Sequence, residues 1–90
     1  MSEKSMIINV YGLVQGVNYR NSAHNKARSL GISGFAENMP DGSVYIEAEG
    51  NADALDAFIE WCGQGPPMAS VSKITTEQAN PFGHQGFRIR

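Results

Sequence analysis

Gly12-Leu13-Val14-Gln15-Gly16-Val17-Asn18-Tyr19-Arg20 is the stretch that decides the fold. The residues before it, 6–11, are rich in β-branched and aromatic side chains and predict a strand. The residues after it continue a helical spacing of apolar side chains, with one face formed by Tyr19, Ala23, Ala27 and Leu30. The chain is therefore expected to pass from a strand, through a turn that contains two glycines, into a helix.

A turn of this kind is suited to binding an anion. The first N–H groups of a helix lack partners within the helix, and the helix dipole favours negative charge beside them. Gly12 and Gly16 allow close approach of the main chain, and the planar guanidinium of Arg20 matches phosphate oxygens. The spacing fits neither a P-loop nor the dinucleotide motif Gly-x-Gly-x-x-Gly. An ordinary turn followed by a solvated arginine is the alternative interpretation of the stretch taken alone.

Composition narrows the class of protein. The chain has 90 residues, 41% of them hydrophobic, which predicts one domain over residues 1–90 with residues 1–5 as a flexible N-terminal segment. The net charge of −2 argues against a dedicated nucleic-acid-binding protein, and the single cysteine, Cys62, excludes an internal disulfide. Apolar runs are too short to span a membrane, and residues 1–5 do not resemble a signal peptide. We expect a cytoplasmic monomer that binds neither nucleic acid nor membranes.

The rest of the chain predicts four more strands and a second helix. Apolar and polar side chains alternate along 43–50, which predicts a strand with one buried face, and the Pro-Asp-Gly turn before it joins it to a strand at 34–38. A helix is expected to begin near Asn51, an N-cap residue, and to end at the glycines and prolines of 63–67. Its core-facing stripe is Leu55, Phe58, Ile59 and Cys62. Two further strands are expected at 70–77 and at 87–90, and in the first of them Val71 and Ile74 break the strict alternation and indicate a bulge.

The predicted order of elements is β-α-β-β-α-β with one additional strand. Two helices then cover one face of a mixed, mainly antiparallel sheet of four or five strands. This arrangement is the ferredoxin-like α+β sandwich.

Three motifs in the chain resemble signatures of the acylphosphatase family. The first is Val14-Gln15-Gly16-Val17-x-Tyr19-Arg20, in which the position of Tyr19 is more often Phe. The second is Gly34-Phe35-x-x-Asn38 followed by Asp41-Gly42, and the third is Gly65-Pro66-Pro67-Met68-Ala69-x-Val71. The motifs keep the family's order and spacing, and the resemblance covers the chain from about Ile7 to Arg90.

The resemblance implies an enzyme that hydrolyses small-molecule acyl phosphates to a carboxylate and inorganic phosphate, without a metal, another cofactor or a covalent intermediate. It implies that Arg20 binds the phosphate and that Asn38 orients the attacking water. Inorganic phosphate would be both a product and a competitive inhibitor. Ala36 and Glu37 depart from the family's pattern beside Asn38 and bear on substrate affinity more than on the reaction. The main-chain amides that would surround the phosphoryl oxygens belong to Gln15, Gly16, Val17, Asn18, Tyr19 and Arg20.

Such a reaction needs few side chains. The leaving carboxylate has an intrinsic pKa of about 4–5, so it departs without a general acid. Phosphoryl transfer depends mostly on positioning and on charge stabilisation, which amides and one guanidinium can provide. His24, Glu37 and Asp41 are interpreted as surface or turn residues rather than as a general base. The two histidines and the cysteine also lack the spacing of a metal site.

Two non-enzymatic alternatives remain at this level. One is a ferredoxin-like module that binds an anion or a nucleic acid without catalysis. An RNA-binding sheet of this topology needs exposed aromatic and basic side chains, whereas Tyr45 is accompanied by Glu47 and Glu49. The other alternative is a phosphatase loop that has lost catalysis and serves as a sensor or interaction domain.

Overall fold

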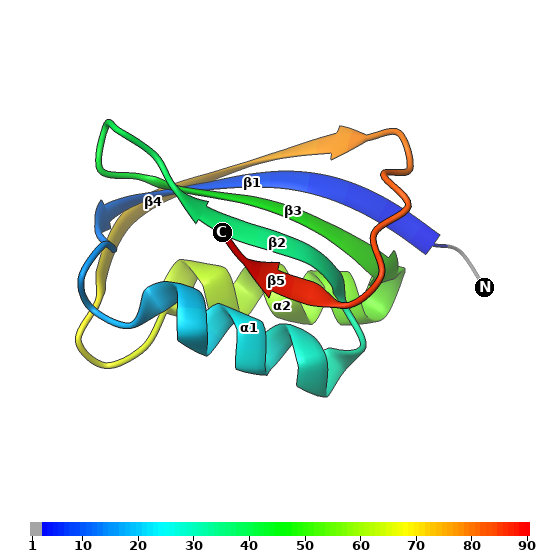
Figure 1. Ribbon diagram of the computed structural model, residues 1–90, viewed down its shortest axis with the longest axis horizontal. Coiled ribbons are helices and arrows are strands. Elements are labelled where there is room, and N and C mark those ends of the chain that lie inside the picture. Colours follow the sequence, from blue (N-terminus) through cyan, green and yellow to red (C-terminus); the bar gives the residue numbers. More distant parts are fainter. Residues whose placement is uncertain (1–2) are drawn as a thin grey trace.

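Two layers make up residues 3–90, the part of the chain described by this computed structural model (Figure 1). Both helices lie on the same face of a five-stranded sheet whose strand order is β4-β1-β3-β2-β5. Neighbouring strands are antiparallel except for β2 and β5, which pair in parallel. The predicted ferredoxin-like α+β fold is therefore confirmed, with five strands. The elements are β1 (Glu3–Leu13), α1 (Tyr19–Leu30), β2 (Ser33–Asn38), β3 (Val44–Asn51), α2 (Ala52–Gln64), β4 (Ser70–Ala79) and β5 (Phe87–Ile89).

The core lies between the sheet and the helices, as the alternation in the sequence predicts. Along β3, Val44, Ile46 and Ala48 are buried, while the intervening side chains are only partly covered. The helices contribute Tyr19, Ala23, Ala27, Leu55, Phe58 and Cys62 to the same core. Asn51 caps α2, since its Oδ1 accepts a hydrogen bond from the main-chain N–H of Asp53 at 2.9 Å.

Gly12 lies in the sheet, whereas the sequence predicts it in the turn before the first helix. The first strand continues to Leu13, so Gly12 lies inside β1 with φ 122°. A Cβ at this position would collide with the main chain of Ser70 and Ser72 in β4. The pairing of β1 with β4 also shifts here, because Tyr11 is opposite Lys73 whereas Gly12 is opposite Val71. This irregularity in β4 is the predicted bulge.

The N-terminal segment also differs from the expectation that residues 1–5 are flexible. Residues 1–2 lie outside the described part of the chain, and residues 3–5 belong to β1. Ser5 is buried, and its hydroxyl donates to Glu49 Oε2 at 2.7 Å. The sequence pattern missed this extension because residues 3–5 are polar. Neither helix within residues 3–90 has the length and apolar content needed to cross a bilayer.

Candidate active site

The loop between β1 and α1 has an unusual main-chain conformation. Gly16 and Asn18 both have positive φ, 75° and 66°, and Asn18 is the one non-glycine residue with positive φ in residues 3–90. Asparagine tolerates this region better than most side chains, and such turns can expose successive N–H groups to one anion. Val14, which is 1% exposed, anchors the start of the loop in the core. The loop is thus shaped by its glycine, its asparagine and one apolar anchor.

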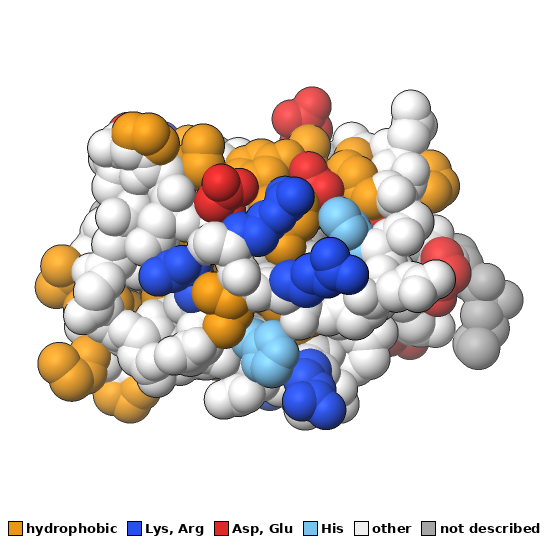
Figure 2. All heavy atoms as spheres, viewed as in Figure 1, with side chains coloured by type: hydrophobic (Ala, Val, Ile, Leu, Met, Phe, Trp, Pro, Cys, Tyr) orange, Lys and Arg blue, Asp and Glu red, His pale blue; other side chains and the backbone are white. Residues whose placement is uncertain are grey.

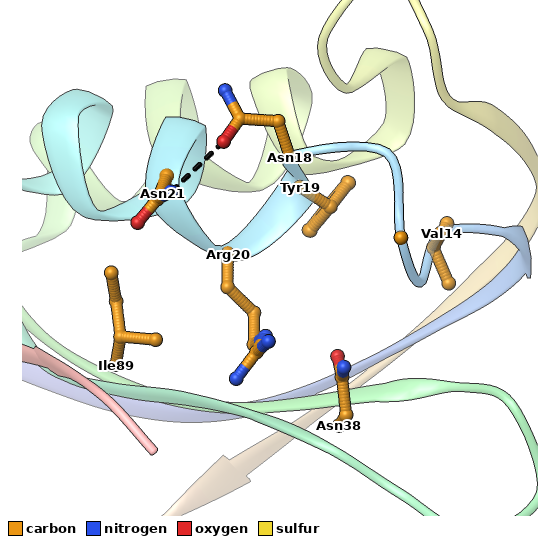
Figure 3. Close-up of a pocket in the computed structure, with 8 residues that line it drawn as sticks. Val14, Asn18, Tyr19, Arg20, Asn21, Asn38 and Ile89 are labelled. Atoms are coloured by element: carbon orange, nitrogen blue, oxygen red, sulfur yellow. Dashed lines mark hydrogen bonds between the residues drawn. The ribbon is translucent and has the colours of Figure 1, made fainter.

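The amide donors of this loop are not used within the protein. Within residues 3–90, no main-chain N–H from Gln15 to Arg20 donates to a main-chain or side-chain oxygen. The side chain of Asn18 does not cap the helix, because its Oδ1 instead accepts from Asn21 Nδ2 at 2.9 Å (Figure 3). The N-terminal end of α1 therefore keeps its unpaired donors and its partial positive charge.

Tyr19 and Arg20 each connect the start of α1 to another segment of the chain. Tyr19 is buried, packs against Trp61, and donates its hydroxyl to the main-chain oxygen of Cys62 at 2.8 Å. Burial, followed by the interactions with Cys62, raises the pKa of Tyr19 above its ordinary value. The guanidinium of Arg20 donates through Nη1 to the main-chain oxygen of Arg90 at 2.7 Å. An arginine has five N–H donors, so this bond leaves others for a ligand.

Asn38 ends β2 with its side chain on the helix side of the sheet. It lies opposite the buried Val44, whereas Glu37 lies opposite Tyr45 on the other face. Glu37 therefore points away from Asn38, as predicted, and Ala36 is fully buried in the core. The Oδ1 atom of Asn38 is buried and accepts no hydrogen bond from residues 3–90. A buried acceptor without a donor is costly, and in native proteins it often marks a functional position.

One cavity brings these groups together (Figure 3). Its volume is about 240 Å³, which suits a small anion rather than a drug-sized ligand of roughly 300–1,000 Å³. Among the residues predicted for the site, Gly16, Asn18, Tyr19, Arg20 and Asn38 line it, whereas Gln15 and Val17 do not. The remaining lining residues, which the sequence analysis did not assign to the site, are Val14, Asn21 and Ile89.

The side chain of Gln15 has a supporting position that the sequence analysis missed. Its Nε2 donates to the main-chain oxygens of Met39 and Ser43, at 2.8 and 2.9 Å. Both acceptors flank the turn between β2 and β3, so Gln15 ties the amide loop to the strand end that carries Asn38. Its place in the first motif was the only sequence signal for this contact. The position of Ile89 could have been inferred from its alternation with Phe87, but Asn21 gave no signal.

The other titratable candidates lie outside the cavity. His24 contacts Asn25 and the ring of Phe87. Asp41 accepts from the hydroxyl and the main-chain N–H of Ser43, which lowers the pKa of Asp41 and identifies it as a turn residue. His84 Nε2 lies 2.8 Å from Glu47 Oε1 on the opposite face of the sheet from the helices. Within residues 3–90, no three His, Cys, Asp or Glu side chains lie close enough to hold a metal ion.

The net charge of the chain is −2, yet one face carries several basic side chains close together (Figure 2). Figure 2 shows lysine and arginine side chains gathered near the middle of the face on which β5 lies over α1. Arg20 lines the cavity together with Asn18 and Tyr19 at the N-terminal end of α1 (Figure 3). A local positive potential raises the concentration of an anionic ligand at the cavity, even where the whole protein is acidic.

Comparisons with known proteins show the family to which the chain belongs. The sequence model named acylphosphatase matches residues 6–89. The acylphosphatase of Thermotoga petrophila is 42% identical to this chain over 87 residues, which cover 97% of each chain. The acylphosphatase of Yersinia pseudotuberculosis is 42% identical over 91 residues, which cover 100% of this chain and 99% of the relative. The solved acylphosphatase of Coxiella burnetii superposes with a TM-score of 0.94 at 35% identity, covering 98% of this chain and 93% of that one. The chain belongs to the acylphosphatase family, hydrolases that act on acyl phosphates.

Proposed function

We propose that this protein hydrolyses acyl phosphates without a metal ion, that Arg20 and the amides of residues 15–20 bind the phosphoryl group, and that Asn38 orients the attacking water. The observation that carries the proposal is the single cavity lined by Arg20, Asn38 and the residues that begin α1. Each of these groups has hydrogen-bonding capacity that residues 3–90 do not use.

The donors suit the charge that develops during the reaction. Phosphoryl transfer passes through a transition state in which negative charge is spread over the equatorial oxygens. Fixed N–H groups and a guanidinium stabilise this charge without reorganising. Because they lie at a turn and on the first residues of a helix, their positions are set by the fold before substrate arrives.

The amide oxygen of Asn38 supplies an acceptor for a water proton. A water bound there would have its direction fixed relative to the phosphorus atom, and the buried oxygen would gain the partner that the protein does not provide. The carboxylate leaves without protonation. The proton released by the attacking water then passes to a phosphate oxygen, which makes a dedicated base unnecessary.

Hydrolysis of benzoyl phosphate in the presence of EDTA tests the proposal. We expect turnover to continue in the presence of EDTA, and we expect inorganic phosphate to inhibit it competitively. Arg20→Ala should abolish substrate binding and turnover together, and Asn38→Ala should lower kcat about 10²–10³-fold, as for the loss of one transition-state contact. Arg28→Ala, an exposed substitution in the last turn of α1, is the matched control and should retain full activity. Folded Arg20→Ala and Asn38→Ala variants with full activity, or turnover that EDTA removes, would contradict the assignment.

We also propose that the protein acts as a monomer in a reducing compartment such as the cytoplasm. Cys62 is a buried free thiol, a state that a reducing compartment maintains. Within residues 3–90 only Leu13, Met68 and Ile89 are exposed large apolar side chains, which is little apolar surface for a stable dimer. Sedimentation velocity measures the oligomeric state, and a concentration-independent dimer would overturn this part of the proposal.

A further inference from the structure

Ile89 is an apolar side chain at the edge of a cavity whose other functional groups are polar. It is 41% exposed, and it is the one exposed large apolar residue among residues 3–90 that lines this cavity. Isolated apolar side chains on a surface are common and need no explanation. Ile89 differs from Leu13 and Met68 because it lies beside the proposed phosphate ligands.

The position of Ile89 follows from the geometry of β5. Side chains two residues apart in a strand share a face, so Ile89 is on the same face as Phe87, which is buried against Phe58. Strand β5 pairs with β2 through Ala36 opposite Ile89, and the N–H of Arg90 donates to Ala36 at 2.9 Å. Arg20 contacts the main-chain oxygen of the next residue, Arg90. Ile89 is thus held on a paired strand next to the guanidinium.

The arrangement around Arg20 separates two sides of the cavity. In Figure 3, Asn38 and Ile89 lie on opposite sides of the Arg20 side chain. In phosphoryl transfer the attacking and leaving oxygens are roughly in line through phosphorus. If water is held at Asn38 and the phosphoryl group at Arg20, the bond that breaks points away from Asn38. The acyl group of the substrate then extends toward Ile89.

We infer that Ile89 is the acyl-group contact of this site and that it makes the enzyme favour acyl phosphates with a bulky apolar acyl group over acetyl phosphate. This inference rests on the proposed function, since it takes the phosphate position from Arg20 and the direction of attack from Asn38. Burial of a ring against the exposed part of Ile89 removes apolar surface from water, which corresponds to a preference of roughly 5- to 10-fold. The contact is made before and during the reaction, so it acts on KM more than on kcat.

The test compares Ile89→Thr with Ile89→Val, two β-branched residues of similar shape that differ in polarity. For benzoyl phosphate we expect KM to rise about 5- to 10-fold in Ile89→Thr and less than about 2-fold in Ile89→Val. For acetyl phosphate, and for inhibition by inorganic phosphate, both variants should match the parent protein. Met68→Thr, an exposed apolar residue that does not line the cavity, is the control and should leave both substrates unaffected. An equal rise in KM for both substrates would overturn the inference.

A binding measurement separates this inference from the hydrolytic function. The probes are 2-phenylethylphosphonate and propylphosphonate, which place a ring or a methyl group as far from phosphorus as the two acyl phosphates do and cannot be hydrolysed. Calorimetry should show tighter binding of the phenyl compound to the parent protein and loss of that preference in Ile89→Thr. A preference that depends on Ile89 without hydrolysis of acyl phosphates would support the acyl contact and reject the proposed function. Hydrolysis without any such preference would reject the acyl contact alone.

Discussion

Asn38 carries an amide oxygen that is buried yet accepts no hydrogen bond from residues 3–90. A buried acceptor without a donor costs about 1–3 kcal/mol of folding free energy, so such a residue is kept only where it has another role. The proposed water-orienting role would account for its retention, because the Asn38 side chain lines the same cavity as Arg20. Residues that serve function at the expense of stability are common in active sites.

Asn38→Ala should therefore separate stability from activity. We expect the free energy of unfolding to stay equal to that of the parent protein or to rise by up to about 2 kcal/mol, since the unpaired acceptor is removed. Urea denaturation measures this change, while kcat falls as described above. A loss of more than about 1 kcal/mol would mean that the side chain has a structural role, and the argument for a water-orienting amide would fail.

At the scale of elements, Gln15 links the loop before α1 to the turn between β2 and β3. Its two hydrogen bonds, to Met39 and Ser43, cross between segments that carry the two halves of the proposed site. The loop itself contributes amides and the strand end contributes Asn38. Their relative position is thus set by a side chain that does not line the cavity.

Gln15→Leu should weaken substrate binding without removing any proposed ligand. Loss of two hydrogen bonds should lower the free energy of unfolding by about 1–2 kcal/mol, and the loosened loop should raise both KM for benzoyl phosphate and the inhibition constant for inorganic phosphate. Steady-state kinetics and urea denaturation give these values. Gln64→Leu, an exposed glutamine at the end of α2, provides the comparison. Unchanged phosphate inhibition in Gln15→Leu would show that the loop holds its conformation without this link.

At the scale of the whole molecule, Glu49 holds the segment between β4 and β5 against the sheet through hydrogen bonds. Its carboxylate accepts from the hydroxyl of Ser5, at 2.7 Å, and from the main-chain N–H groups of Phe82 and His84, at 2.6 and 2.8 Å. Burial opposes ionisation, but hydrogen bonds from Ser5, His84, Phe82 and Gly83 outweigh it and lower the pKa of Glu49. The ionised carboxylate is therefore the form that the folded protein prefers.

This lowered pKa predicts an acid-sensitive fold. The folded state binds the proton of Glu49 less readily than the unfolded state does, so the stabilisation is present above the ordinary pKa of about 4.3 and is lost as the pH falls through the lower folded value. Glu49→Gln should be less stable than the parent protein at pH 7, and its stability should depend less on pH below about 4.5. Urea denaturation between pH 3 and 7 tests this, with the exposed Glu60→Gln as control. Parallel pH profiles for the parent and Glu49→Gln would contradict it.

Local signals account for what the sequence predicted well. The alternation along β3 and the Asn51 cap depend on a few neighbouring residues, so the sequence alone predicts them. Arg20 and Asn38 were proposed from motifs, and the fold brings them to one cavity. The parallel pairing of β5 with β2 and the hydrogen bonds of Gln15 arise from contacts between distant segments. Residue patterns in one sequence do not reveal contacts between distant segments, so these features are visible only in the structure.

The hydrogen bond from Arg20 to Arg90 spans 70 positions of the chain. A ribosome adds residues one after another, so the guanidinium emerges long before the strand against which it rests. The proposed phosphate-binding cavity is complete only after β5 has paired with β2. A nascent polypeptide that stops short of β5 lacks one wall of this cavity. Affinity for inorganic phosphate would therefore report the completion of folding as well as the occupancy of the site.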